Sequence, residues 1–171
     1  CYGVTRVSHD EYALSSQERC AKAQDEGLFD DEIVPMKTKM LLVNKETGAE
    51  KEVDEVVDRD NCNRPETTLE GLASLNPVFD PEEGSVTAGN SSQLSDGASV
   101  TMVMSEDKAN ELGVKPLAYF RGFTVVGCQP DEMGIGPLYS IPKLLKAANL
   151  TVDDIDLWEL NEAFASLVVY I

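Results

Sequence analysis

Apolar positions near the amino-terminal end follow the period of a helix. A capping-box pattern, Ser8-His9-Asp10-Glu11, precedes apolar residues that recur from Tyr12 to Ala23, and Gly27 supplies a stop signal. These signals predict an amphipathic helix of about 18 residues. His9 falls in its first turn and is expected to face solvent.

An extended pattern with turn residues follows this helix. Glu32 to Lys37 is expected to be an edge strand, because Pro35 has no N–H to donate to a ladder. Met40 to Asn44 and Glu50 to Val57 flank a segment with the composition of a hairpin turn. A short helix is predicted over Thr68 to Leu75.

From residue 98 the pattern alternates between strand and helix. The predicted strands span residues 98–104, 117–126 and 155–160, and the predicted helices span 105–112, 133–149 and 162–171. Such alternation predicts parallel strands joined by crossover helices, as in α/β domains. Pro142 either kinks the 133–149 helix or marks its true start.

Composition favours an ordinary folded protein with an acidic surface. Hydrophobic residues make up 42% of the 171 residues, and no apolar run approaches the roughly 20 residues of a membrane-spanning helix. The net charge of −17 argues against nucleic acids and anionic membranes as partners, because clustered Lys and Arg bind both. A polyanionic ligand would need a local basic residue that overrides this field.

The cysteines and the single histidine form no metal or redox motif. Cys1, Cys20, Cys62 and Cys128 lack C-x-x-C spacing and the context of a nucleophile, which favours a reduced, intracellular setting. No metal site is predicted. The chain starts at Cys1 without a signal-peptide pattern, so both ends are interpreted as cut; the compartment, whether cytoplasm, peroxisome or mitochondrion, stays open.

Three loops rich in small or polar residues are the candidates for function. They are Thr87 to Gly97, Met133 to Pro137 and Asn161 to Ala165, and each also suits a tight strand-to-helix turn. Gly134-Ile135-Gly136 lacks the third glycine of a dinucleotide fingerprint, and neither a P-loop nor a G-x-S-x-G elbow occurs. Asn161 follows a predicted strand directly, where α/β domains place polar side chains against ligands.

Taken together, these loops resemble the thiolases. That family shows, in the same order, Thr87-Ala88-Gly89-Asn90-Ser91-Ser92, Asp131-Glu132-Met133-Gly134-Ile135-Gly136-Pro137 and Asn161-Glu162-Ala163-Phe164-Ala165, and it also resembles this chain over Asp10 to Gln17 and Arg64 to Leu72. The chain is similar to 3-ketoacyl-CoA and acetyl-CoA thiolases over essentially its whole length. The forms of the first two loops lean toward the degradative branch.

The resemblance implies roles for residues of the first and third loops. Asn161 matches the asparagine that holds a catalytic water beside the thioester oxygen. Ser92 matches the residue that contacts the pantetheine part of CoA, and Ala163 and Phe164 match positions that line the same tunnel.

Two further matches concern the ends of the ligand. Met133 matches the residue bordering the acyl pocket, and Arg64 matches a basic position near the adenosine phosphates, which would be the local cation that this acidic chain needs. The family's nucleophilic cysteine, its G-H-P histidine and its C-x-G cysteine match nothing here. The resemblance places the first before these residues and the others after Ile171, so the 171 residues alone are expected to be inactive.

The resemblance implies a thiolase-like α/β fold, only partly present: two similar domains with mostly parallel sheets, plus an inserted loop domain. Residues 1–94 would be part of the loop domain that covers CoA, 95–115 the end of the N-terminal thiolase domain and 116–171 the start of the C-terminal one.

The implied reaction is thiolysis of 3-ketoacyl-CoA, or the reverse condensation, through a cysteine-bound acyl intermediate in fatty acid β-oxidation. CoA would be a substrate with no permanently bound cofactor, and homodimers or homotetramers are expected. A lipid-CoA binding protein without turnover and an acidic interaction module are the alternatives.

Overall fold

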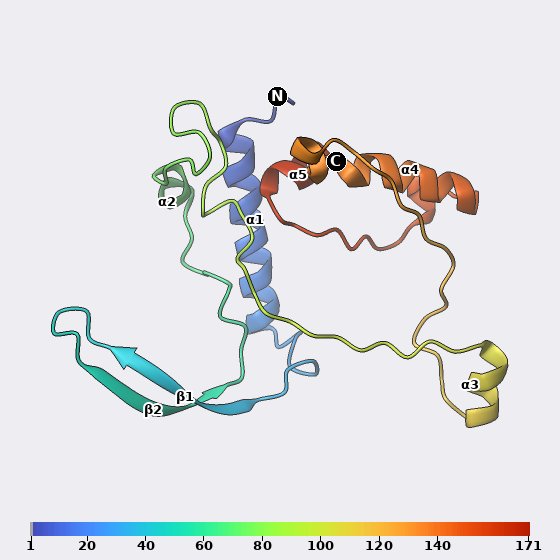
Figure 1. The fold of residues 1–171 in the computed structure, drawn as a ribbon, viewed down its shortest axis with the longest axis horizontal. Helices are drawn as coiled ribbons and strands as arrows, with labels where there is room; N and C mark the ends of the chain where they lie inside the picture. The colour runs from blue at the N-terminus through green and yellow to red at the C-terminus, as the bar shows by residue number, and fades with distance from the viewer. Residues whose placement is uncertain (1) are drawn as a thin grey trace. The chain divides into compact units, whose positions relative to one another are not determined.

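The computed structural model describes residues 2–171, and the chain divides into two compact units (Figure 1). One unit is Thr5–Asn90, and the other is Ser91–Ile171 together with the segment that precedes Thr5. None of the helices within residues 2–171 is both long enough and apolar enough to cross a bilayer.

The first helix, α1, spans Arg6–Asp25 and confirms the helix predicted there. Its N-cap is Thr5, whose Oγ1 accepts the Ser8 N–H at 3.2 Å, so the helix begins earlier than the capping-box pattern indicated. His9 consequently lies one turn before Ala13 on the same helix face, and both are buried. The expectation that His9 faces solvent is wrong: it is 2% exposed, with Nδ1 3.4 Å from the Ser85 carbonyl oxygen.

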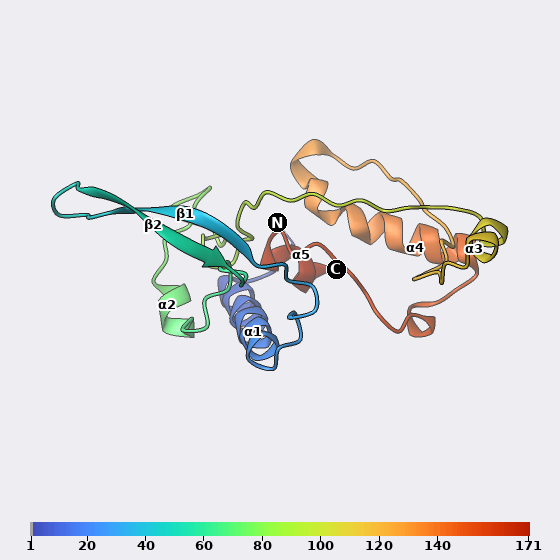
Figure 2. The ribbon, with the colours of Figure 1, turned by 90° about the horizontal axis from the view of Figure 1, so that it is seen from below.

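An antiparallel hairpin follows, formed by β1 (Met36–Val43) and β2 (Glu50–Val57) (Figure 2). The hairpin is confirmed, but the edge strand expected over residues 32–37 is wrong, because the ladder begins only after Pro35, which has no N–H to contribute. At the turn, Asn44 Oδ1 accepts the backbone N–H groups of Glu46 and Thr47 at 2.9 and 3.0 Å.

The short helix α2 (Leu69–Ala73) is confirmed as well. Thr68 caps it, since its Oγ1 accepts the Gly71 N–H at 3.1 Å, and Leu72 is buried. The helix contacts α1 through Arg6, which donates from Nη2 to the carbonyl oxygens of Leu72 and Leu75 at 2.7 and 3.0 Å. These bonds tie Arg6 to the carboxyl end of α2, where the Leu72 oxygen also accepts the Leu75 N–H at 3.1 Å.

The second unit is helical where helices were predicted. Its elements are α3 (Glu106–Leu112), the 3₁₀ helix η1 (Pro130–Ile135), α4 (Gly136–Ala148), the 3₁₀ helix η2 (Val152–Asp154) and α5 (Ala165–Tyr170). Ser105 caps α3, and Gly113 ends it in the left-handed region at φ 66°. Pro142 lies inside α4, which decides the alternative left open above: it does not mark the helix start.

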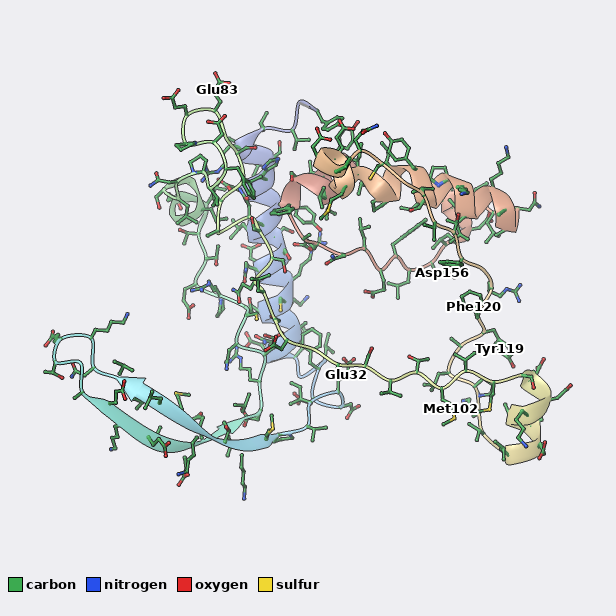
Figure 3. The ribbon with its side chains drawn as sticks, in the orientation of Figure 1. Glu32, Glu83, Met102, Tyr119, Phe120 and Asp156 are labelled. Atoms are coloured by element: carbon green, nitrogen blue, oxygen red, sulfur yellow. The ribbon has the colours of Figure 1, made fainter. Side chains whose placement is uncertain are left out.

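The segments 98–104, 117–126 and 155–160 are not strands, which corrects the predicted parallel sheet for the described part of the chain. They run as connections with exposed side chains, among them Met102, Tyr119 and Phe120 (Figure 3). The physical reason is that a strand needs a neighbour to which its backbone can hydrogen-bond. Within residues 2–171 the only sheet is formed by β1 and β2, which pair with each other and not with these segments.

Candidate functional site

The backbone brings two of the three candidate loops together. Ser91 and Phe164 form an antiparallel β-bridge, and the Ser92 N–H donates to the Ala163 carbonyl oxygen at 2.8 Å. Residues more than seventy positions apart in the sequence therefore share main-chain hydrogen bonds. The structure thus places Ser92 beside Ala163 and Phe164, three of the residues selected from the sequence.

The second loop, Met133 to Pro137, lies against the helix that continues the third loop, Asn161 to Ala165. Gly134 belongs to η1, and a Cβ atom at this position would overlap the side chain of Leu167 in α5. The glycine thus allows this close approach without displacing the Leu167 side chain. Because η1 contacts α5 and α5 begins at Ala165, the loops around Met133 and Asn161 belong to one local structure with Ser92.

The side chains in this local structure differ in exposure. Met133 is 75% exposed and Asn161 is exposed, whereas Ala163 and Phe164 are half-buried. The Asn161 amide makes no hydrogen bond within the described part of the chain. An unpaired amide at a loop can donate to a water molecule or to a carbonyl oxygen.

Arg64 belongs to the other unit, Thr5–Asn90. Its backbone is held from both sides: the N–H donates to Gln17 Oε1 at 2.7 Å, and the carbonyl accepts the Thr67 N–H at 3.1 Å and the Thr67 hydroxyl at 2.7 Å. The side chain is exposed, and its guanidinium forms no ion pair with any described residue. The position is fixed while the cationic head can bind an anion.

A buried polar cluster, which sequence reasoning missed, holds the loop before Ser91. It consists of Arg6, Asp10, Thr87 and Asn90, and we call it the Asp10 cluster. Asp10, Thr87 and Asn90 are 2%, 0% and 3% exposed. Asp10 accepts Arg6 Nε–H at 2.7 Å and Asn90 Nδ2–H at 2.9 Å, and Asn90 Oδ1 accepts the Thr87 N–H at 2.8 Å. One sequence signal is the four-residue spacing of Arg6 and Asp10, which is also typical of surface ion pairs. The other is that Asp10, Thr87 and Asn90 lie in segments that resemble the thiolases, but neither signal predicts that these residues contact one another.

Tyr2 ties the segment before Thr5 to η1 and α5. Its hydroxyl donates to Glu132 Oε1, and its ring lies 4.6 Å from that of Tyr170, centroid to centroid, with the planes tilted by 44°. The hydrogen bond to Glu132, partial burial and the negative charge of Glu132 together raise the pKa of Tyr2 to about 12. Glu132 immediately precedes Met133, so this contact holds one side of the second loop, Met133 to Pro137.

The Glu132 contact makes a titration testable. In Glu132→Gln we expect the pKa of Tyr2 to fall from about 12 toward 10.0, because the carboxylate that opposes the phenolate is gone. A raised folded-state pKa gives stability that is complete below the unfolded value and is lost as the pH rises through about 12. The change is measured as tyrosinate absorbance against pH, with Tyr2→Phe identifying the Tyr2 contribution. An unchanged curve in Glu132→Gln would show that the carboxylate does not set this pKa.

The cysteines and the acidic residues offer no second chemistry within the described residues. Burial raises the pKa of the Cys20 thiol, the charge of Asp60 raises it further and Arg59 opposes them, so the thiolate is disfavoured. Cys20, Cys62 and Cys128 form no disulfide. No group of three or more His, Cys, Asp or Glu side chains among residues 2–171 is arranged to hold a metal ion.

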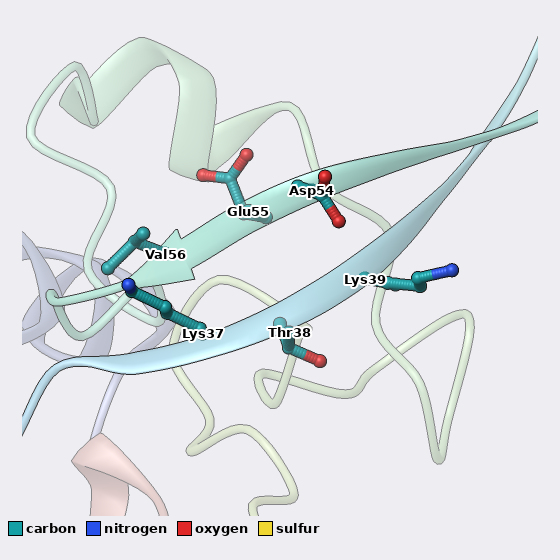
Figure 4. A pocket seen from close by; sticks show the side chains of 6 residues that line it. All are labelled: Lys37, Thr38, Lys39, Asp54, Glu55 and Val56. Atoms are coloured by element: carbon teal, nitrogen blue, oxygen red, sulfur yellow. The ribbon is translucent and has the colours of Figure 1, made fainter.

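A hollow on the hairpin is a poor candidate for the site. It is lined by Lys37, Thr38, Lys39, Asp54, Glu55 and Val56 (Figure 4). Its walls are mostly charged side chains of both signs, and every one of them is exposed. Ligand sites usually have apolar walls with a few polar groups, so a fatty acyl chain finds no suitable surface here.

Comparisons with known proteins agree with one another. The family models described as "Thiolase, N-terminal domain" and "Thiolase, C-terminal domain" match residues 1–107 and 114–171. The 3-ketoacyl-CoA thiolase of Aliivibrio fischeri is 52% identical over 165 residues, which are 96% of this chain and 40% of that protein. The peroxisomal 3-ketoacyl-CoA thiolase B of Mus musculus is 49% identical over 169 residues, which are 99% of this chain and 38% of that protein.

Solved structures give the same result at the level of the fold. The Bacillus anthracis acetyl-CoA acetyltransferase matches with a TM-score of 0.84 and 44% identity, over 99% of this chain and 40% of that one. The human mitochondrial 3-ketoacyl-CoA thiolase, solved in complex with CoA, matches with a TM-score of 0.79 and 39% identity, over 98% of this chain and 38% of that one. The chain thus spans about two fifths of the length of these relatives.

Proposed function

Since this chain belongs to the thiolase family, we propose that the full-length protein is an acyltransferase that cleaves 3-ketoacyl-CoA with CoA, giving acetyl-CoA and a shortened acyl-CoA. The same enzyme would catalyse the reverse condensation. The resemblance inferred from the sequence and the partly present thiolase-like fold are both confirmed. The proposal rests above all on one observation: Ser92 is bonded to Ala163, so the loop assigned to pantetheine meets the loop assigned to the catalytic water.

The proposed chemistry follows from what each group can do. A cysteine thiolate outside these residues attacks the 3-keto carbon, the bond to the α-carbon breaks, and the electron pair leaves with acetyl-CoA, which is protonated. Incoming CoA thiolate then takes the acyl group from the enzyme and releases the cysteine thiolate. Asn161 would stabilise the developing oxyanion through a held water, where each oriented donor is worth about 3 kcal/mol.

The remaining candidate residues would bind the substrates. Ser92, Ala163 and Phe164 would line the pantetheine tunnel, Met133 would border the acyl pocket, and Arg64 would face the adenosine phosphates. The unpaired Arg64 guanidinium and the half-buried Ala163 and Phe164 suit these tasks. A related human enzyme solved with CoA supports CoA as a substrate.

We also propose the domain assignment, with residues 1–94 in the loop domain, 95–115 ending the N-terminal domain and 116–171 starting the C-terminal one. It is supported by the division between Asn90 and Ser91 and by the gap between the two matched family models, residues 108–113. Homodimers or homotetramers are proposed, in the cytoplasm, a peroxisome or a mitochondrion. Two of the similar proteins carry the words "peroxisomal" and "mitochondrial" in their names.

The proposal is tested by incubating the full-length protein with a 3-ketoacyl-CoA and CoA. Chromatography should show equimolar acetyl-CoA and a product two carbons shorter than the substrate, appearing only when CoA is present. Thermal stabilisation by CoA without any product would instead support the lipid-CoA binding protein. No stabilisation and no product would leave the acidic interaction module.

Arg64→Ala is expected to raise the KM for CoA about three- to tenfold and to leave kcat nearly unchanged. One exposed charge-assisted hydrogen bond to phosphate is worth about 1 kcal/mol, and its loss affects the ground state and the transition state alike. The KM should also become less sensitive to salt. Arg19→Ala on the exposed side of α1 is the matched control. An equal change of KM in both variants would argue against a specific phosphate contact by Arg64.

A further inference from the structure

We propose that Asp10 is a positioning residue for CoA binding, and that it acts through Asn90 on the segment Ser91-Ser92. This inference rests on the proposed function, because the role of Ser92 toward pantetheine comes from there. Asp10 itself is buried on α1 and contacts no substrate. Its effect would travel through the hydrogen bonds of the Asp10 cluster.

Both carboxylate oxygens of Asp10 are occupied. Oδ2 accepts Arg6 Nε–H at 2.7 Å, and Oδ1 accepts Asn90 Nδ2–H at 2.9 Å. Arg6 also bonds the carbonyl oxygens of Leu72 and Leu75, so one arginine joins Asp10 to the end of α2. With Asp10 almost fully buried, these bonds are short, directional and shielded from water.

Asn90 connects Asp10 to the loop Ser85–Asn90. Its Nδ2 donates to the Ser85 carbonyl at 3.0 Å as well as to Asp10, and its Oδ1 accepts the Thr87 N–H at 2.8 Å. The Asn90 side chain therefore holds the loop Ser85–Asn90 in one conformation through three hydrogen bonds. Gly89 confirms how closely it packs, since a Cβ there would come within 2.5 and 2.6 Å of the Leu72 and Leu75 side chains.

A role beyond stability follows from the chemistry of the cluster. Well-packed apolar residues can replace a buried ion pair without loss of stability, so stability alone does not require Asp10. A polar network differs in that it fixes one geometry. Ser92 follows Asn90 by two residues, so at most about 7 Å of extended chain separates them. A displacement of about 1 Å at a group that binds the substrate can remove a large part of the binding energy which that group contributes.

The test exchanges the two buried side chains in the full-length protein. In Asp10→Asn, the new amide has one oxygen for the two N–H groups that Asp10 accepts. With that oxygen on Arg6, its NH2 group faces the NH2 group of Asn90, so one Asn90 N–H loses its acceptor. In Asn90→Asp, two carboxylates face each other in a buried place. In the double variant Asp10→Asn with Asn90→Asp, Arg6, residue 10, residue 90 and Thr87 can all pair again, and only the bond to Ser85 is lost.

We expect each single variant to raise the KM for CoA about tenfold with kcat within threefold of wild type, and the double variant to return KM to within threefold. Asp25→Asn, at the exposed end of α1, is the charge-matched control. A purely structural role would lower the melting temperature and leave the KM of the folded enzyme unchanged, which would overturn the inference. So would a double variant no better than either single one.

A second readout separates this inference from the proposed function. Hydrogen exchange of the Ser92 amide, which bonds Ala163, should speed up in the single variants and recover in the double one, while amides of α4 stay as in wild type. If the wild-type protein neither binds CoA nor turns over, the proposed function fails and exchange still decides whether Asp10 orders this segment. Should the single variants not fold, Arg6→Lys, which lies at the partly exposed rim, replaces them; unchanged exchange and KM there would contradict the proposal.

Discussion

Asn161→Ala is expected to lower kcat for thiolysis of 3-ketoacyl-CoA by the full-length protein about 100- to 1000-fold, with a much smaller change in KM. The residue is exposed in the third loop, and its amide is not used by any hydrogen bond within the described part of the chain. A donor held at a developing oxyanion acts mainly in the transition state, so its removal affects kcat more than substrate binding.

Asn161→Asp sharpens this test. A carboxylate has nearly the shape of the amide, but it accepts hydrogen bonds only and carries a negative charge toward a developing negative charge. We therefore expect Asn161→Asp to be at least as slow as Asn161→Ala. Single-turnover measurement of acyl transfer shows whether the chemical step is the one that slows.

The control for Asn161 is Asn110→Ala on α3. Asn110 is also exposed and is remote from the three candidate loops in sequence, so the same deletion should leave kcat within twofold. If Asn161→Ala kept wild-type kcat, the catalytic role assigned to this residue would be refuted, even if the thiolase activity itself were confirmed.

Helices could be predicted from the sequence because their signals are local. The caps Thr68 and Ser105 and the stop at Gly113 each act within one turn of the helix that they delimit. The segments 98–104, 117–126 and 155–160 carry the composition of strands but are not strands, because pairing depends on residues elsewhere in the chain. Local composition determines how well a strand packs, but it does not show whether another strand is present to pair with it.

The candidate site shows the same limit. The resemblance of the three loops to the thiolases was enough to select Ser92, Met133 and Asn161. In the structure, hydrogen bonds join the first loop to the third, and the contact between η1 and α5 joins the second to the third. The burial of His9 and Asp10 could not be predicted, because the contact that explains it joins Asp10 to Asn90, 80 residues away. An ion pair at helical spacing is normally exposed, so nothing nearby marked this one as different.

The same distant contact leads to the largest stability effect that we expect. Asn90→Ala should destabilise the protein by about 3 to 5 kcal/mol, because it leaves the buried Thr87 N–H and one oxygen of the buried Asp10 carboxylate without their partner. Thr87 is fully buried, so its N–H has no alternative acceptor in solvent. The effect is measured as a lower melting temperature and as faster hydrogen exchange at the Thr87 amide.

Asn44→Ala is the matched control, since Asn44 Oδ1 also accepts backbone N–H groups, those of Glu46 and Thr47, but in an exposed turn. Water can replace the lost acceptor there, so we expect a cost of at most about 1 kcal/mol. The two variants remove the same side chain and differ in burial, and the difference between them measures what burial adds. Equal losses would mean that the Asp10 cluster is open to water in solution, and the proposed control of Ser92 by Asp10 would then lose its physical basis.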